Sequence, residues 1–162
     1  MNLKSSDIVK LLGLIELPEE GGYYSRTYQS PESVELPRGN RALGDAIYYL
    51  ITEDQFSGLH KLKCDEMWHF YEGHPLEICF IDAEAKLNFI KLGRDFEKGE
   101  VLQAVVPANC WFGSYLTEGS DYALVGCTVS PGFDFQDFEM PDRNELLKLY
   151  PEFSDIILKL TH

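Results

Sequence analysis

The sequence predicts an all-β protein, a jelly-roll β-barrel with short N- and C-terminal helices. Between Ala46 and Pro131, short β-forming runs alternate with turn residues, a pattern typical of sandwiches and barrels that hide their strand edges. The predicted strands are Ala46–Thr52, Gly58–Leu62, Met67–Glu72, Leu76–Ile81, Leu87–Leu92, Gln103–Val106, Cys110–Leu116 and Tyr122–Ser130. With 162 residues, of which 44% are hydrophobic, the chain can bury the core of one domain.

A short helix is predicted near the N-terminus. Ser5 and Ser6 are good N-cap residues, and Ile8, Val9, Leu11 and Leu12 form an apolar stripe, so the helix is predicted over about Asp7–Leu12. Gly13 can end this helix in the left-handed conformation.

The next segment is predicted to contain a strand and then an irregular stretch. Gly21-Gly22 breaks the chain before Tyr23–Tyr28, which is rich in aromatic and β-branched residues. Gln29–Gly44 contains prolines and glycines, so we expect a surface loop or an edge with local pairing.

The C-terminal tail returns to helix. Asp142 is a candidate cap for a helix over Glu145–Leu149, and Pro151 stops that helix and is suited to open another. An apolar face then follows at Ile156, Ile157, Leu158 and Leu160. We therefore predict a single domain over residues 1–162, with a barrel core from about 20 to 138 and a helical tail from about 142 to 161.

The charge balance excludes two classes of partner. With 14 basic and 27 acidic residues the formal net charge is −13, so the surface repels nucleic-acid backbones and anionic lipids. No apolar run is long enough to span a membrane, and the N-terminus lacks the pattern of a secretory signal. The cysteines, Cys64, Cys79, Cys110 and Cys127, have neither C-x-x-C nor zinc-ligand spacing. We therefore expect a reduced, cytoplasmic protein.

The segment Ser57–Gly73 resembles the first signature of the cupin superfamily, G-x5-H-x-H-x(3,4)-E-x6-G. His60, Glu66 and Gly73 occupy signature positions, whereas Leu62 stands where the second histidine would be.

The second cupin signature, G-x5-P-x-G-x2-H-x3-N, is also altered. Pro107 is kept, Asn109 replaces a glycine in a position that suits a left-handed turn, and Phe112 replaces the histidine. Metal-dependent cupins use two histidines and a glutamate from the first signature and one histidine from the second. We therefore predict no cofactor, and a divalent metal is disfavoured; if one binds, His60 and Glu66 are its ligands.

Across most of its length the chain resembles a family of small cupins of unknown function, often called the fifth cupin family. The matching segments are Glu19–Tyr24, Ile47–Ile51, Asp65–Gly73, Val106–Ala108 and Leu124–Phe135. Where that family has His-Pro-Glu-Gly-Gly, this chain has Pro18-Glu19-Glu20-Gly21-Gly22. The resemblance implies a jelly-roll barrel, a homodimer and a cavity lined by aromatic and polar side chains, but no particular reaction.

The polar residues of the first signature indicate acid–base chemistry. Glu66 would orient the imidazole of His60 as a general base, and Tyr49 would donate a proton from the opposite side. This set resembles the histidine base and tyrosine acid of metal-free sugar-nucleotide epimerases in the cupin superfamily. The predicted ligand-binding residues are Trp68, Phe70, Gln103, Trp111 and Phe112, mostly as an aromatic wall.

Three functions remain open from the sequence. The first is a metal-independent isomerase or epimerase that acts on a small carbohydrate-like molecule. The second is a non-catalytic cupin that binds or senses a small ligand. The third, a metal-dependent dioxygenase, is disfavoured by Leu62 and Phe112.

Overall fold

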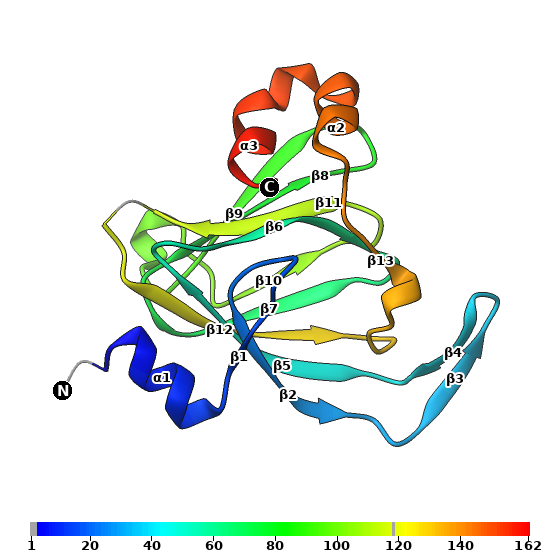
Figure 1. Cartoon of the computed structure of the whole chain (residues 1–162), viewed down its shortest axis with the longest axis horizontal. Coiled ribbons are helices and arrows are strands. Elements are labelled where there is room, and N and C mark those ends of the chain that lie inside the picture. The colour runs from blue at the N-terminus through cyan, green and yellow to red at the C-terminus, as the bar shows by residue number, and fades with distance from the viewer. Residues whose placement is uncertain (1–2, 118) are drawn as a thin grey trace.

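Two antiparallel sheets face each other in the computed structural model, which describes residues 3–117 and 119–162 (Figure 1). The six-stranded sheet has the order β1 (Ile15–Glu16), β2 (Tyr23–Gln29), β5 (Asp45–Thr52), β12 (Tyr122–Val129), β7 (Glu66–Gly73) and β10 (Gln103–Val106). The five-stranded sheet has the order β13 (Phe138–Glu139), β6 (Phe56–Leu62), β11 (Trp111–Leu116), β8 (Leu76–Ile81) and β9 (Leu87–Leu92). The all-β jelly roll is therefore confirmed.

The segment Gln29–Gly44 forms local pairing, one of the two predicted alternatives. Strands β3 (Ser33–Leu36) and β4 (Gly39–Ala42) make a separate two-stranded hairpin. In Figure 1 this hairpin rises beside the open end of the two sheets.

The N-terminal helix α1 (Ser5–Leu12) begins earlier than predicted, and neither predicted serine caps it. Lys4 is the N-cap, and its backbone N–H donates to the carboxylate of Asp7 at 3.2 Å. The acceptor is therefore a side chain inside the helix, and Ser5 and Ser6, the residue type expected at an N-cap, do not supply it. Gly13 ends the helix with φ 61°, as predicted.

The C-terminal helices start at Asp142 and Pro151, the cap and the opening residue that the sequence predicted. The carboxylate of Asp142 accepts from the N–H of Glu145 at 2.9 Å at the start of α2 (Arg143–Leu149). Pro151 opens η3 (Pro151–Phe153), which leads into α3 (Ser154–Lys159). Two further 3₁₀ turns are η1 (Phe96–Lys98) and η2 (Phe135–Asp137).

Helices cover the outer faces of both sheets. Leu146, Ile157 and Leu160 of the tail pack on Leu59 and Cys79 of the five-stranded sheet, above which the tail lies in Figure 1. Helix α1 covers part of the other sheet, where Ile8 packs with Leu50 and Tyr122. Among the residues that the structure describes, no helix is long and apolar enough to cross a membrane.

The main core lies between the sheets and fills one end of that space. Its largest side chains include Trp68, Phe70, Ile78, Leu92 and Phe112. The opposite end, beside β1, β2 and β13, is hollow.

Candidate functional site

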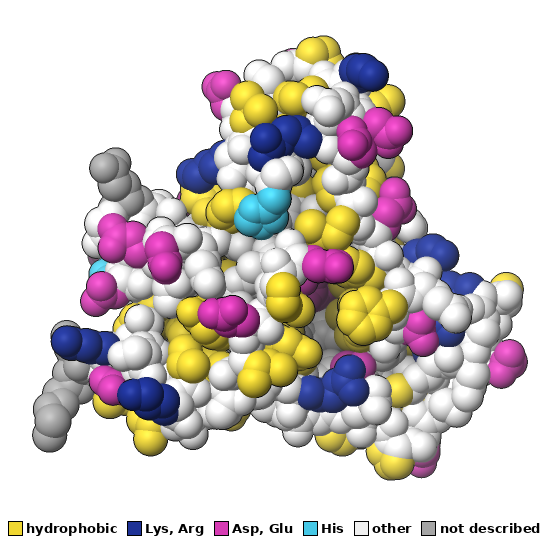
Figure 2. Space-filling view, viewed as in Figure 1, with side chains coloured by type: hydrophobic (Ala, Val, Ile, Leu, Met, Phe, Trp, Pro, Cys, Tyr) yellow, Lys and Arg dark blue, Asp and Glu magenta, His cyan; other side chains and the backbone are white. Residues whose placement is uncertain are grey.

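A cavity of about 620 Å³ occupies the hollow end. Figure 2 shows the face on which it opens, where hydrophobic side chains surround a central hollow and charged groups lie at its edge. This volume is typical of small-molecule sites. The lining residues are Ile15, Glu16, Leu17, Pro18, Glu19, Glu20, Tyr24, Arg26, Asp45, Ile47, Tyr49, His60, Leu62, Glu66, Cys127, Val129, Phe133, Phe135 and Phe138.

Glu20 enters the cavity from the turn between β1 and β2, and that turn is fixed to β6. The backbone N–H of Gly58 donates to the carbonyl of Glu20 at 2.6 Å, and the hydroxyl of Ser57 donates to its carboxylate at 2.8 Å. Gly21 follows with φ 95°, where a Cβ would lie 2.2 Å from the carbonyl oxygen of Phe56. Only glycine fits this close approach, so the Gly21-Gly22 pair sets the position of Glu20.

The imidazole of His60 projects from β6 and is 2% exposed. Its Nδ1 lies 2.7 Å from the carbonyl oxygen of Gly58. A carbonyl only accepts, so Nδ1 carries the proton and the neutral ring has its lone pair on Nε2. Nε2 lies 3.9 Å from the carboxylate of Glu20, while Phe112 supports the ring from a centroid distance of 4.0 Å.

Glu66 begins β7 and is 8% exposed, and its Oε2 has no hydrogen-bond partner in the protein. Burial, followed by the nearby negative charge of Glu20, raises the pKa of Glu66 to about 8. The side chain is therefore mostly protonated at neutral pH and can donate a proton. Burial and the charge of Glu66 also raise the pKa of the neighbouring Cys127 well above its usual value, so that thiol is not activated.

The Tyr49 hydroxyl donates to the carbonyl of Gly21 at 2.8 Å, which ties β5 to the same turn that carries Glu20. Burial and the charge of Glu20 raise the pKa of Tyr49 well above its usual value. Trp68 packs against its ring edge-on, with centroids 5.9 Å apart. Tyr49 is thus held in place and keeps its proton.

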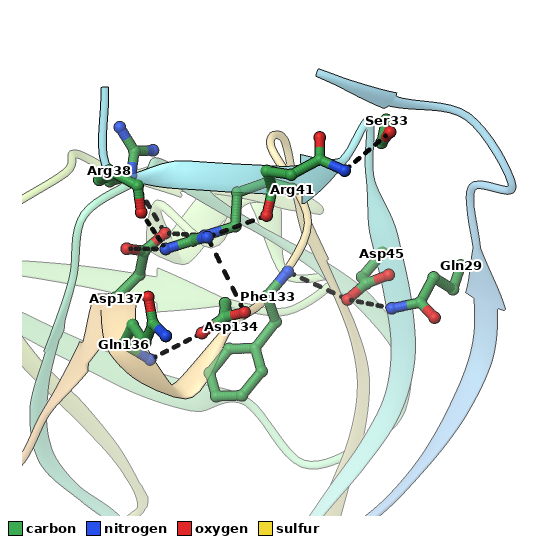
Figure 3. A network of polar contacts seen from close by, with 10 residues as sticks. Gln29, Ser33, Arg38, Arg41, Asp45, Phe133, Asp134, Gln136 and Asp137 are labelled. Atoms are coloured by element: carbon green, nitrogen blue, oxygen red, sulfur yellow. Dashed lines mark hydrogen bonds and ion pairs between the residues drawn. The ribbon is translucent and has the colours of Figure 1, made fainter. Parts of the chain in front are cut away.

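The mouth of the cavity is formed by the segment after β12 and is fixed by the network in Figure 3. The buried guanidinium of Arg41 in β4 donates to both oxygens of Asp137 at 2.9 and 3.0 Å, and these bonds lower the pKa of Asp137. The N–H of Phe133 donates to Asp45 at 3.0 Å, and the carboxylate of Asp134 accepts from the N–H of Gln136. The hairpin and the mouth are therefore joined by a buried ion pair.

Comparison with known proteins identifies the family. The family model described as "Cupin superfamily (DUF985)" matches residues 6–141. The chain belongs to this cupin family. It is a family of unknown function, so the match gives the fold and no activity.

Three similar proteins have names that give no activity. An uncharacterised protein of Saccharomyces cerevisiae, YML079W, is 30% identical over 132 residues, which span 73% of this chain and 66% of the yeast protein. Among solved structures, protein SO0799 of Shewanella oneidensis is 37% identical with a TM-score of 0.92, and a hypothetical protein of Leishmania major is 35% identical with the same TM-score. Each alignment covers 99% of both chains.

The structure brings the predicted catalytic residues His60, Glu66 and Tyr49 to one cavity, but it changes their relations. Strands β6 and β7 lie in different sheets rather than side by side. Within the described chain, the carboxylate within 4.0 Å of His60 is that of Glu20 rather than that of Glu66. The predicted His60–Glu66 dyad is replaced by a His60–Glu20 contact.

The predicted ligand-binding residues do not line the cavity. Trp68, Phe70 and Phe112 are buried in the core behind it and support the wall. Gln103 is exposed on β10, where its amide contacts His69 at 3.0 Å. Trp111 packs with the C-terminal helices on the outer face, beneath Lys61. The aromatic surface of the cavity instead comes from Phe133, Phe135 and Phe138.

Several polar cavity residues were not predicted as site residues from the sequence, among them Glu20, Asp45 and Cys127. Glu20 had one signal, its place before Gly21-Gly22, because a glutamate at the point where glycines force a turn can be presented to a pocket. Asp45 directly precedes one predicted strand and Cys127 lies inside another, so no local pattern marks either of them as a site residue.

The donor set does not fit the metal centre of metal-dependent cupins. Leu62 lies on the cavity wall, and Phe112 packs against the His60 ring, so apolar side chains stand where two ligands would be. Across residues 3–117 and 119–162, no group of three or more His, Cys, Asp or Glu side chains is arranged to hold a metal ion. We therefore derive no step through a metal.

Proposed function

We propose that this cupin binds a small, carbohydrate-like molecule in its cavity and moves a proton on it, as a metal-independent isomerase or epimerase. The observation that carries the proposal is the pairing, in one cavity, of an imidazole with a free Nε2 and a carboxyl group that is still protonated at neutral pH. A base and an acid of this kind are what proton abstraction and return require.

The residues take different roles from those that the sequence predicted. His60 removes a proton through Nε2, and Glu20 stabilises the resulting imidazolium from 3.9 Å. Glu66 supplies a proton at the other side of the ligand. Tyr49 holds the Glu20 turn through Gly21 rather than donating a proton, because its hydroxyl is already engaged and its pKa is raised.

The test is hydrogen exchange into the ligand. Ligands found by thermal shift are incubated with the protein in D₂O, and deuterium at carbon is followed by NMR. His60→Asn and Glu66→Gln should each slow incorporation by about 10² or more while the fold is kept. His74→Asn is the matched control, because His74 is exposed and lies outside the cavity. Incorporation at the wild-type rate in His60→Asn would exclude the mechanism.

A second candidate, non-catalytic binding, is favoured by one observation. The imidazole of His60 is 2% exposed and packed against Phe112, which limits its access to a substrate carbon. In that case a ligand raises the melting temperature by mass action without exchange or product. The same D₂O experiment separates the two functions.

We also propose that the protein forms a homodimer through the outer face of the six-stranded sheet. Met67 and Val105 lie opposite each other on β7 and β10, and both are exposed, as is Tyr71 further along β7. Exposed apolar groups of this kind mark interaction surfaces. Analytical ultracentrifugation should give a dimer at micromolar concentration, and a monomer for Met67→Lys combined with Val105→Lys. A monomeric wild type would contradict the proposal.

A further inference from the structure

The charged groups of the cavity are strongly unbalanced. Two of its lining residues are basic, Arg26 and His60, and five are carboxylates: Glu16, Glu19, Glu20, Asp45 and Glu66. Within the described residues, no ion pair joins Arg26 to any of these carboxylates. A cavity of this kind attracts cations and repels phosphates and carboxylates.

Two of the carboxylates are buried and incompletely paired. Glu66 and Asp45 are 8% and 4% exposed, and Glu66 Oε2 and Asp45 Oδ1 have no hydrogen-bond partner in the protein. The other oxygen of Asp45 is held by Phe133 and Gln29, which fixes the orientation of the group (Figure 3). Unpaired buried acceptors are rare because each costs free energy, so the Asp45 oxygen indicates a ligand that brings a donor.

An apolar aromatic rim stands above these carboxylates. Phe133, Phe135 and Phe138 pack edge-to-face, with ring centroids 5.1 to 6.4 Å apart. Phe135 is 76% exposed at the mouth. Aromatic faces attract both flat apolar bodies and organic cations.

We propose that the ligand is an organic amine whose ammonium group pairs with the buried carboxylate of Asp45 and whose ring packs on the phenylalanine rim. This inference names a ligand class for the proposed function. It rests on that function only because both use the same cavity. An amino sugar has the required parts, because its C–H face can pack on an aromatic ring. A sugar nucleotide does not, because its diphosphate would meet five carboxylates.

The test uses three probes of the same shape and different charge: 2-phenylethylamine, 2-phenylethanol and phenylacetate. Calorimetric titration of the full chain at millimolar probe concentration should show the amine binding about tenfold or more tightly than the alcohol. The carboxylate should show no binding, and added salt should weaken the amine alone. Equal binding of all three, preference for phenylacetate, or no binding of the amine would overturn the proposal.

Variants connect the preference to Asp45. Asp45→Asn should reduce the advantage of the amine over the alcohol to less than threefold. Glu72→Gln, an exposed substitution on β7, should leave that advantage unchanged. An advantage that survives Asp45→Asn would overturn the proposal. Amine preference without deuterium exchange would refute the proposed catalysis while leaving this inference intact, so the two failures are distinguishable.

Discussion

The space between the two sheets has two ends that are built from the same strands but filled differently. At one end β5, β7 and β12 contribute Ile51, Phe70 and Val125 to a closed apolar core. At the other end the same three strands contribute Asp45, Glu66 and Cys127 to an open cavity. The closed end stabilises the fold by burying apolar surface, whereas the open end carries buried polar groups that lower stability. Natural proteins keep such costs where function requires them, so the contrast locates the site.

Truncating one isoleucine at each end should give the clearest contrast. Ile78→Ala leaves a void in the closed core and should lower the free energy of unfolding by about 3 kcal/mol. Ile47→Ala lies on the cavity wall, where the void already exists, and should cost about 1 kcal/mol. Urea denaturation measures both, and equal losses would show that the cavity closes in solution.

Glu66→Gln should raise stability at neutral and alkaline pH. The folded pKa of Glu66 is about 8 against an ordinary value of 4.5, so between these values the folded chain binds more protons than the unfolded chain. Stability conferred by the protonated group is therefore complete below pH 4.5 and is lost as pH rises through 8.

The glutamine variant does not titrate, and it should be close to the wild type near pH 5 and exceed it by on the order of 4 kcal/mol at pH 8. Denaturation from pH 5 to 8.5 gives the difference, with Glu72→Gln as the exposed control. Parallel curves for wild type and Glu66→Gln would mean that Glu66 titrates normally.

Tyr49→Phe should have a smaller effect. It removes the hydroxyl that donates to the carbonyl of Gly21 and should cost about 1 kcal/mol. Deuterium exchange should continue, because Glu66 holds the proton. Loss of exchange with an intact fold would instead restore Tyr49 to the acid role that the sequence predicted.

Chelation should have the smallest effect. Treatment with EDTA should not change the melting temperature, and plasma mass spectrometry of freshly purified protein should find less than stoichiometric metal. Near-stoichiometric iron, manganese, nickel or zinc would show that ligands other than the signature positions complete a site around His60 and Glu66.

The fold was largely predictable because strand signals are local. Turn residues such as those before Pro75 and after Pro107 end each run, and each predicted strand has an observed counterpart whose ends lie within about two residues of it. The two-residue strands β1 and β13 were not predicted. The start of α1 was missed because Asp7, inside the helix, takes the acceptor role expected of a serine cap.

The site was predictable only where alternation along a strand decides it. His60 and Leu62 share a face, and both reach the cavity wall. Trp111 and Phe112 are consecutive, so they point to opposite faces and cannot both belong to an inner wall. Gln103 likewise points outward because its neighbour Ala104 is buried. Glu20 reaches His60 through a tertiary contact, which no local pattern encodes.

Glu20 also has a consequence for how members of this family can diverge. The carboxylate nearest to His60 comes from the turn before β2, and the aromatic rim comes from the segment after β12. Apart from Phe138 in the two-residue strand β13, the residues of these two segments lie outside the strands of the barrel. Substitutions in these two short segments can therefore alter which molecule is accepted while the barrel keeps its packing, so one scaffold can serve relatives with different ligands.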